Sequence, residues 1–264
     1  MTRLTAHSGV QVWRDDGAMP DRVAEEVPVA LLYNGQPHVV MMCTPADLED
    51  FARGFSVTED IVETVDELGH VQLSALPEQA GFEVNITIPV TRAAALGGRQ
   101  RHLQGRTGCG LCGAQTLDAA IRPVRRVPAG CRISRAAIRR ALAALKQQQP
   151  LNAATGATHA AAWVTPDGLI VAAREDVGRH NALDKLIGHL LTTQQDLARG
   201  FLVITSRASY EMVHKAARVG IPVVVALSAP TAYAIRVAEA AGLSLIGFAR
   251  ADRQVIYSCP GRIA

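Results

Sequence analysis

Residues 201–248, FLVITSRASYEMVHKAARVGIPVVVALSAPTAYAIRVAEAAGLSLIGF, decide the fold class of this chain. Short apolar runs alternate here with longer segments in which apolar residues recur at helical spacing. The pattern predicts strands at 201–205, 222–227 and 244–248 and helices at 210–219 and 231–241. Because helices connect these strands, the order predicts a parallel or mixed sheet with helices packed on it.

The preceding residues extend the same pattern toward the middle of the chain. Ser134 is a candidate N-cap for a helix that runs to residue 149, and a polar link follows at 150–156. Two strands then surround the turn at 166–168, and a helix follows at 181–191. The predicted fold class is therefore α/β, with a mixed sheet flanked by helices.

The first part of the chain is richer in strands. Apolar runs at 27–33 and 38–43 surround Asn34-Gly35, a dipeptide that is typical of a tight hairpin turn. We therefore expect two domains, a smaller β-rich part over 1–130 and an α/β ligand-binding domain over 131–264.

One helix is expected within this β-rich part. Thr44 is its candidate N-cap, Pro45 suits the first helical position, and the helix continues through 46–57. A half-buried strand is predicted at 82–89. The stretch 97–113 has neither periodicity and is rich in Gly and Arg, so we expect an exposed loop there.

Length and composition limit the function classes. A chain of 264 residues with a net charge of +3, 48% hydrophobic and 19% charged residues is typical of a globular protein. Residues 1–16 lack the apolar core of a secretory signal, and no apolar run reaches membrane-spanning length. We therefore expect a cytoplasmic protein that contacts no membrane. The small net charge gives no indication of a nucleic-acid partner.

Basic residues gather in the middle of the chain, at 99–106, 122–126 and 132–140. Such clusters fit an anionic ligand of limited size, and they equally fit a solvated face.

Each predicted strand of the α/β part is followed by polar residues. These are Glu175, Asp176, Gly178, Arg179, His180 and Asn181, then Ser206, Arg207 and Ser209, then Ser228 and Thr231, and finally 250–253. Ligands of open α/β sheets bind at the carboxyl ends of strands, where helix N-termini offer free N–H groups. Helix capping explains Ser, Thr and Asn equally well, but it does not require the cations Arg179, His180 and Arg207. We therefore predict a phosphate-bearing anion at this edge.

Residues 107–113, TGCGLCG, contain a Cys-x-x-Cys pair, Cys109 and Cys112. Flanking glycines leave the sulfurs unshielded, and upstream basic residues, Arg99, Arg101, His102 and Arg106, favour the thiolate. The motif is thus typical of a reactive thiol such as a sulfur carrier requires.

Three other interpretations of the pair stay open. Half of a zinc site would need further ligands, but Cys43, Cys131 and Cys259 stand alone and no second pair exists, so no metal is expected. A thioredoxin-like dithiol would follow a strand and open a helix, whereas the residues before Cys109 are rich in Gly and Arg. A structural disulfide fits poorly with a reducing compartment.

Four motifs resemble the formate dehydrogenase accessory sulfurtransferase family, FdhD. They are EDVGRHNALDK at 175–185, TSRASYEMV at 205–213, SAPT at 228–231 and GFAR at 247–250, and the cysteine run matches as well. The resemblance extends over nearly the whole chain, from the hairpin near Val27 to Tyr257.

The resemblance implies a sulfurtransferase with a cytidine-deaminase-like fold that acts as a homodimer. Such proteins accept sulfur from a cysteine desulfurase as a persulfide and pass it to the molybdenum cofactor, bis-molybdopterin guanine dinucleotide, for formate dehydrogenase. By motif, Cys109 carries the persulfide and Cys112 is an assisting or resolving thiol. The cofactor segment of the family falls on Phe248, Ala249, Arg250, Ala251, Asp252 and Arg253. To these we add Arg179, His180, Ser206 and Arg207 from the strand-end pattern.

The candidate cations also include Lys185 and Lys215, but both lie within predicted helices, where surface ion pairs are the commoner role. One position departs from the family pattern, because Asp60 stands where relatives tend to have glycine. This puts the end of the early helix in doubt.

Two rival functions remain. A zinc deaminase would need a His or Cys two residues before a catalytic Glu, and neither pair occurs upstream of Cys109. A molybdenum-cofactor chaperone would hold the cofactor without covalent sulfur chemistry.

Overall fold

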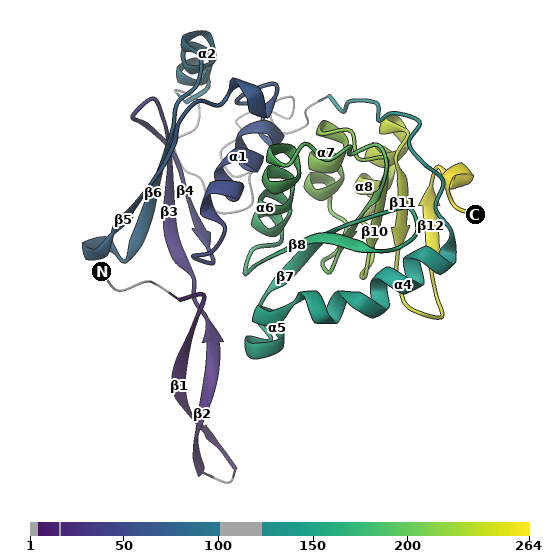
Figure 1. Ribbon diagram of the computed structural model, residues 1–264, viewed down its shortest axis with the longest axis horizontal. Helices are drawn as coiled ribbons and strands as arrows, with labels where there is room; N and C mark the ends of the chain where they lie inside the picture. Colours follow the sequence, from purple (N-terminus) through teal and green to yellow (C-terminus); the bar gives the residue numbers. More distant parts are fainter. Residues whose placement is uncertain (1–4, 16, 101–122) are drawn as a thin grey trace.

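The computed structural model describes residues 5–15, 17–100 and 123–264 (Figure 1). A six-stranded sheet with the order β12-β11-β10-β9-β7-β8 forms its larger half. The strands are β7 (His159–Val164), β8 (Ile170–Asp176), β9 (Phe201–Ile204), β10 (Val223–Ala226), β11 (Ser244–Gly247) and β12 (Val255–Ser258). The three strands β9, β10 and β11 are parallel, whereas β7 and β12 are antiparallel to their neighbours. The predicted mixed sheet is confirmed.

Helices cover both faces of this sheet (Figure 1). One face carries α6 (Arg179–Thr192), α7 (Tyr210–Arg218) and α8 (Ala232–Ala241), and the other carries α4 (Arg135–Leu145) and α5 (Pro150–Thr155). Alternate residues of β9 serve the two cores: Leu202 packs in the cluster with α6 and α7, and Val203 in the cluster with α4. A strand buried on both faces therefore appears in the sequence as one continuous apolar run.

A smaller four-stranded sheet, ordered β4-β3-β6-β5, precedes this unit. Its strands are β3 (Val27–Tyr33), β4 (Gln36–Cys43), β5 (Val71–Leu76) and β6 (Gly81–Ile86), and α1 (Leu48–Thr58) packs on it. The predicted hairpin is confirmed, because Asn34 and Gly35 both have positive φ, 52° and 77°. That conformation matches the twist of the two strands it joins.

The remaining elements are short or peripheral. They are β1 (His7–Arg14), β2 (Gly17–Ala24), η1 (Val65–Glu67), η2 (Pro77–Gln79), α2 (Val90–Gln100), η3 (Lys146–Gln148) and η4 (Pro260–Arg262). No helix among the described residues has the length and apolarity that a membrane crossing requires.

Three local predictions were wrong. The first helix starts at Leu48, and its N-cap is Asp47 instead of Thr44. Thr44 is engaged elsewhere, because its N–H donates to the Asp176 carboxylate at 3.0 Å and its hydroxyl accepts from Val177 N–H. The stretch 97–100, expected in a loop, belongs to α2.

The third correction concerns the polar link at 150–156, most of which is helix α5. The Glu175 carboxylate accepts hydrogen bonds from the N–H groups of Leu151 and Asn152 at 2.9 and 2.7 Å. A carboxylate on a distant strand thus caps this helix, which local sequence does not reveal.

Helices α1 and α6 pack against each other at very close range. A Cβ at Gly54 would lie 1.8 Å from the carbonyl oxygen of Asp184, and one at Gly188 would lie 1.9 Å from that of Asp50. Both positions accept only glycine, which lets the two backbones touch. This contact joins the small sheet to the large one, since α1 lies between the small sheet and α6 (Figure 1).

We expect Gly188→Ala to lower the free energy of unfolding by about 2 kcal/mol or more, because overpacking outweighs the gain in helix propensity. Chemical denaturation checks this. The matched control is Gly261→Ala, where a Cβ meets nothing within 4 Å. Equal stabilities of the two variants would contradict the close helix contact.

Candidate functional site

The carboxyl ends of four strands lie at one edge of the six-stranded sheet. The strand β8 shares the direction of β9, β10 and β11, because β7 runs antiparallel to both β8 and β9. Backbone hydrogen bonds join the loops that follow β9, β10 and β11. Ala208 N–H donates to the Ala229 carbonyl, Thr231 N–H to that of Ala208, and Phe248 N–H to that of Ser228. We call these three loops, together with the loop after β8, the carboxyl edge.

Arg179 and His180 lie at the N-terminus of α6, whose N-cap residue Gly178 supplies no side-chain cap. Arg179 Nε is buried and has no hydrogen-bond partner among the described residues. The hydroxyl of Ser209, the N-cap of α7, is also buried and has no hydrogen-bond partner among the described residues. His180 Nε2 lies 2.9 Å from the Glu211 carboxylate, although the atoms are not aligned for a hydrogen bond. Unsatisfied donors at two helix N-termini fit an anion.

His159 adds a third basic group that the sequence analysis missed. It is the first residue of β7, and because this strand is antiparallel, its start lies where its neighbours end. Burial lowers the pKa of His159, and the charges of Arg179 and His180 lower it further. An anion bound among these groups would relieve that repulsion. The direction of β7 is the information that the sequence pattern lacked.

The predicted segment 248–253 forms a turn after β11. Phe248 has a positive φ of 47° and is 37% exposed, and the Arg253 guanidinium lies 5.0 Å from its ring centroid. The Arg250 guanidinium donates to the Leu227 carbonyl at 2.5 Å, and the Arg250 backbone N–H donates to the Arg253 carbonyl at 2.7 Å. Ala249 is buried, whereas Ala251 and Asp252 are exposed. An aromatic ring with an adjacent cation is thus presented at this end of the edge.

The other two predicted residues follow β9. Ser206 is buried, and its hydroxyl donates to the Arg207 carbonyl at 3.0 Å. Arg207 is exposed. Ser206 therefore shapes the loop, and Arg207 is the member that can reach a ligand.

The two cationic ends of the carboxyl edge are well separated. The segment 248–253 follows β11 and Arg179 follows β8, and three strands, β10, β9 and β7, lie between them. With neighbouring strands about 4.8 Å apart, the separation is about 19 Å. One mononucleotide would not span it, but an extended ligand with phosphates near both ends would.

Most of the motif at 175–185 supports the fold. Asp176 is fully buried and pairs with Lys185 at 2.6 Å. It also accepts hydrogen bonds from Gly178 N–H and from the Asn181 amide. Lys185 Nζ in turn donates to the Thr44 carbonyl at 3.0 Å. The expectation that Lys185 is a surface residue was wrong, because it neutralises a buried carboxylate at the junction of the two sheets.

Lys215 is a second correction of the same kind. It is 6% exposed and lies 2.8 Å from Asp184 and 2.9 Å from Glu59, with its Nζ donating to the Thr58 hydroxyl. Burial alone lowers the pKa of Lys215, but the Asp184 and Glu59 carboxylates outweigh it and raise that pKa to about 12. Lys215 is therefore charged and unavailable to a ligand at the carboxyl edge.

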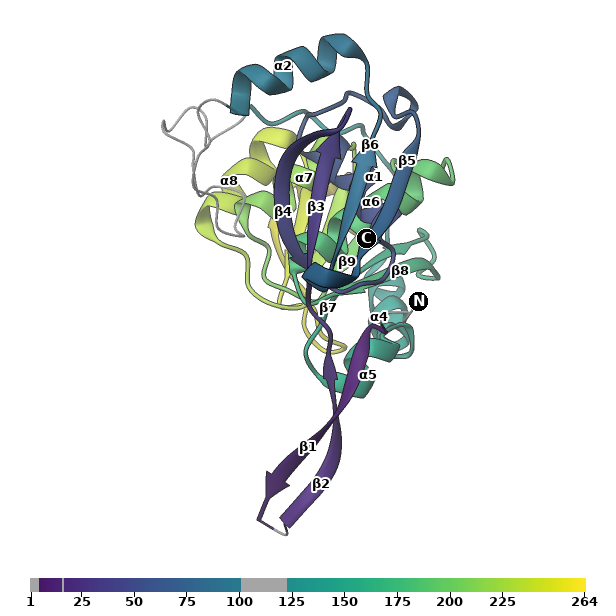
Figure 2. The ribbon, with the colours of Figure 1, turned by 90° about the vertical axis from the view of Figure 1, so that its left-hand side faces the viewer.

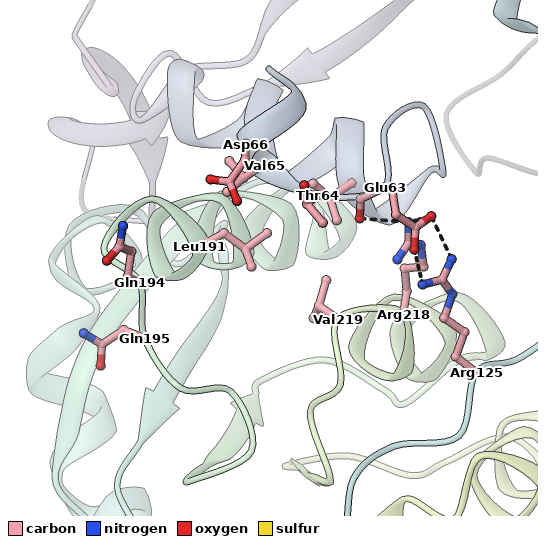
Figure 3. Close-up of a pocket in the computed structure, with 11 residues that line it drawn as sticks. Glu63, Thr64, Val65, Asp66, Arg125, Leu191, Gln194, Gln195, Arg218 and Val219 are labelled. Atoms are coloured by element: carbon pink, nitrogen blue, oxygen red, sulfur yellow. Dashed lines mark hydrogen bonds and ion pairs between the residues drawn. The ribbon is translucent and has the colours of Figure 1, made fainter. Parts of the chain in front are cut away.

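A groove of about 470 Å³ lies at the opposite ends of α6 and α7 (Figure 3). Leu191 and Val219 line it, and Glu63 on its rim pairs with Arg125 and Arg218. The pairing with Arg125, through a side-chain hydrogen bond, lowers the pKa of Glu63. The Glu63 carboxylate is thus engaged by ion pairs within the protein.

Asp60 resolves the doubt about the end of the early helix. The helix α1 ends at Thr58 with Glu59 as C-cap, and Asp60 follows in the left-handed conformation with φ 55°. Its carboxylate pairs with Arg218 at the C-terminus of α7. Asp tolerates this conformation better than most residues, so the departure from glycine preserves the helix end.

The cysteines differ in what the structure reveals. Cys109 and Cys112 lie outside the described residues. Cys43 is fully buried, and burial together with the charge of Asp176 raises its pKa well above the ordinary value. Cys131 is partly exposed, and burial raises its pKa as well. Neither of these two thiols has the environment of a reactive thiolate.

We expect Arg179→Gln to weaken the binding of inorganic pyrophosphate by about tenfold, because a charge-assisted contact is lost. Isothermal titration calorimetry measures this. Arg139→Gln, which removes an exposed arginine on α4, serves as the control and should bind as the unaltered protein does. Unchanged affinity in Arg179→Gln would contradict an anion site at α6.

Pyrophosphate should bind more tightly as the pH falls from about 7.5 to about 5.5. This gain in affinity should be larger in the unaltered protein than in His159→Gln. The pKa of His159 is lowered in the free protein, and a bound anion would raise it, so binding takes up a proton. Because the pKa of His159 is lower in the folded protein than in the unfolded chain, the free protein should also lose stability as the pH falls below about 6.5. Identical pH profiles of the two proteins would exclude His159 from the site.

Comparisons with known proteins agree with this architecture. A model of the FdhD/NarQ family matches residues 24–264. The sulfur carrier protein FdhD of Xanthomonas campestris is 52% identical over 243 residues, 92% of this chain and 86% of that protein. The protein of that name from Cupriavidus necator is 47% identical over 256 residues, 96% of this chain and 88% of that one.

A crystal structure from Desulfotalea psychrophila, described as a formate dehydrogenase accessory protein, has the same fold. Its TM-score is 0.77 at 23% identity, and the similarity covers 98% of both chains. The family match over residues 24–264 and the identities near 50% lead to one conclusion: the chain belongs to the FdhD/NarQ family.

Proposed function

We propose that this protein is a sulfurtransferase that carries sulfur as a persulfide on Cys109 and delivers it to the molybdenum cofactor that formate dehydrogenase requires. The observation that carries the proposal is the pair of cation-bearing ends on the carboxyl edge. Arg179 Nε, which no described residue hydrogen-bonds, lies at one end, and the cluster of Phe248 and Arg253 lies at the other. The names of the relatives, sulfur carrier protein FdhD, support the sulfur chemistry.

The residues present fit bis-molybdopterin guanine dinucleotide as the substrate that accepts the sulfur. This molecule carries two pyrophosphates and two guanines, so it needs cations at separated points and surfaces for its bases. Arg179 Nε and the Ser209 hydroxyl are buried and have no hydrogen-bond partner in the part of the chain that the structure describes, so they suit one phosphate group. The exposed ring of Phe248 suits a guanine, with the Arg253 guanidinium beside it. Arg207 would contact the stretch between them.

Loading requires no external oxidant or reductant. The Cys109 thiolate attacks the outer sulfur of a persulfide on the donor, a cysteine desulfurase. A new sulfur–sulfur bond forms at Cys109, the bond within the donor persulfide breaks, and the donor leaves as a thiolate. A low thiol pKa favours this step, and basic residues just upstream of a cysteine motif in the sequence are typical of such a thiol.

Delivery of the sulfur as sulfide requires two electrons, for which Cys112 is a suitable source. Its thiolate attacks the inner sulfur at Cys109, a disulfide forms between the two cysteines, and the terminal sulfur leaves as hydrosulfide. A cellular thiol then reduces the disulfide and restores both residues. The acceptor site thus receives hydrosulfide, and Arg179 and Arg253 hold the acceptor by its phosphates.

Incubation with cysteine and a cysteine desulfurase, followed by peptide mass spectrometry, tests the proposal. We expect one added sulfur atom on the peptide that contains Cys109 and none on Cys43, which is buried. Cys109→Ala should lose this sulfur and the activation of formate dehydrogenase while it keeps pyrophosphate affinity. Cys131→Ala is the matched control and should behave as the unaltered protein.

A cofactor chaperone without sulfur chemistry gives a different result. Formate dehydrogenase would then be activated normally in Cys109→Ala and poorly in Arg179→Gln. That pattern would refute the persulfide proposal.

A further inference from the structure

The groove lined by Leu191 and Val219 (Figure 3) crosses the boundary between two hydrophobic cores. Both side chains pack against the core of the small sheet and also against the core that contains α6 and α7. Val57 and Val65 add apolar surface from the core of the small sheet. The two cores meet at α1 and α6, which lie behind the strands of the small sheet in Figure 2. A ligand in this groove would therefore contact both units at once.

The size of the groove favours a small molecule. Its volume of about 470 Å³ falls in the range of about 300–1,000 Å³ that small-molecule sites occupy. Eleven residues line it (Figure 3), whereas a stable protein–protein interface uses about 20–30 residues on each side. The groove is therefore large enough for a small ligand and too small to form a protein interface by itself.

The C-terminal ends of three helices meet at this groove. Val57 lies in the last turn of α1, Leu191 lies in the last turn of α6, and Arg218 is the last residue of α7. A helix C-terminus carries about half a negative charge, because its last four carbonyl groups have no partner within the helix. The N-termini of α6 and α7 fit an anion at the carboxyl edge, and their opposite ends favour a cation in the groove.

The charged side chains that line the groove add to this preference. Arg218 pairs with Asp60 and Glu63, and Arg125 pairs with Glu63 as well. The charges of these two arginines and two carboxylates therefore cancel. Asp66 is exposed and forms no hydrogen bond or ion pair with another residue in the part of the chain that the structure describes (Figure 3). Its negative charge is left for a ligand.

Two amide side chains complete the end of the groove at which Asp66 lies. Gln194 and Gln195 are exposed in the turn that follows α6, and Gln194 has a positive φ of 53°. Amide oxygens accept hydrogen bonds from ammonium groups. In Figure 3, Leu191 and Val219 lie between these amides and the arginine pairs. The groove thus has a polar, negatively charged end and an apolar middle.

We propose that this groove binds a small organic cation. The ammonium group of the ligand pairs with Asp66 and donates to the Gln194 amide oxygen, and its alkyl part covers Leu191 and Val219. A carboxylate ligand would be repelled by Asp66 and by the three helix ends, and a neutral ligand would leave Asp66 without a partner. Neither the carboxyl edge nor the cysteine motif takes part, so this site does not depend on the proposed sulfur chemistry.

Titration of the isotope-labelled full chain with butylammonium, followed by NMR, tests the proposal. We expect saturable shifts of the Gln194 and Val219 amide signals. Asp66→Asn should raise the dissociation constant by about threefold or more, because an ion pair is lost. Gln194→Glu, which adds a second carboxylate of the same shape, should lower it by about as much. Asp15→Asn, which removes an exposed carboxylate beside β1, is the matched control and should change it by less than about 1.5-fold.

Two further probes separate charge from apolar contact. Butanol and butyrate have the same alkyl chain without the positive charge, and both should bind at least about threefold more weakly than butylammonium. Equal binding of butanol would overturn the proposal, and so would a dissociation constant for butylammonium that neither Asp66→Asn nor Gln194→Glu changes. The peptide acetyl-Leu-Lys-Leu-amide tests the remaining occupant. Binding of this peptide about tenfold tighter than that of butylammonium would show that the groove docks a protein segment instead of a small cation.

Discussion

The structure depends on the buried carboxylate of Asp176. It neutralises Lys185, accepts hydrogen bonds from Thr44 and Gly178 N–H groups, and orients the Asn181 amide toward Cys43 and the Met42 carbonyl. These contacts connect the end of β8, the start of α6 and the end of β4. Loss of one member of such a buried pair costs about 3–5 kcal/mol, because the other charge is left without a partner. The first turn of α6, which carries Arg179, is therefore fixed by the same group that joins the two sheets.

Much of the large sheet follows from local sequence because its strands are buried on both faces and its helices have one apolar face. The runs at 201–205 and 222–227 correspond to β9 and β10, and Ser134 caps α4 as predicted. Two of the three local errors fall where a distant residue decides the local structure. Glu175 caps α5, and Asp176 draws Thr44 away from the first helix. No window of neighbouring residues contains that information.

The candidate site was predictable to a similar degree, for a related reason. Arg179 and His180 were found because cations are unexpected at a helix N-terminus, where the dipole disfavours them. His159 was missed because its position depends on strand direction, which periodicity does not encode. Lys185 and Lys215 were misjudged because helical lysines are usually solvated, and only tertiary contacts reveal their carboxylate partners. A long sequence motif can thus be maintained largely by packing, with only a few of its residues left for ligands.

The glycine contact between α1 and α6 also limits how the protein can move. Sliding of packed helices needs side chains that can change rotamer, and here backbone meets backbone at Gly54 and Gly188. Shear between the sheets would drive carbonyl oxygens into Cα atoms. The contact between α1 and α6 therefore holds the two sheets in a fixed relative position. Adjustment to substrates of different shape then falls to the loops of the carboxyl edge, while the frame that holds them keeps its dimensions.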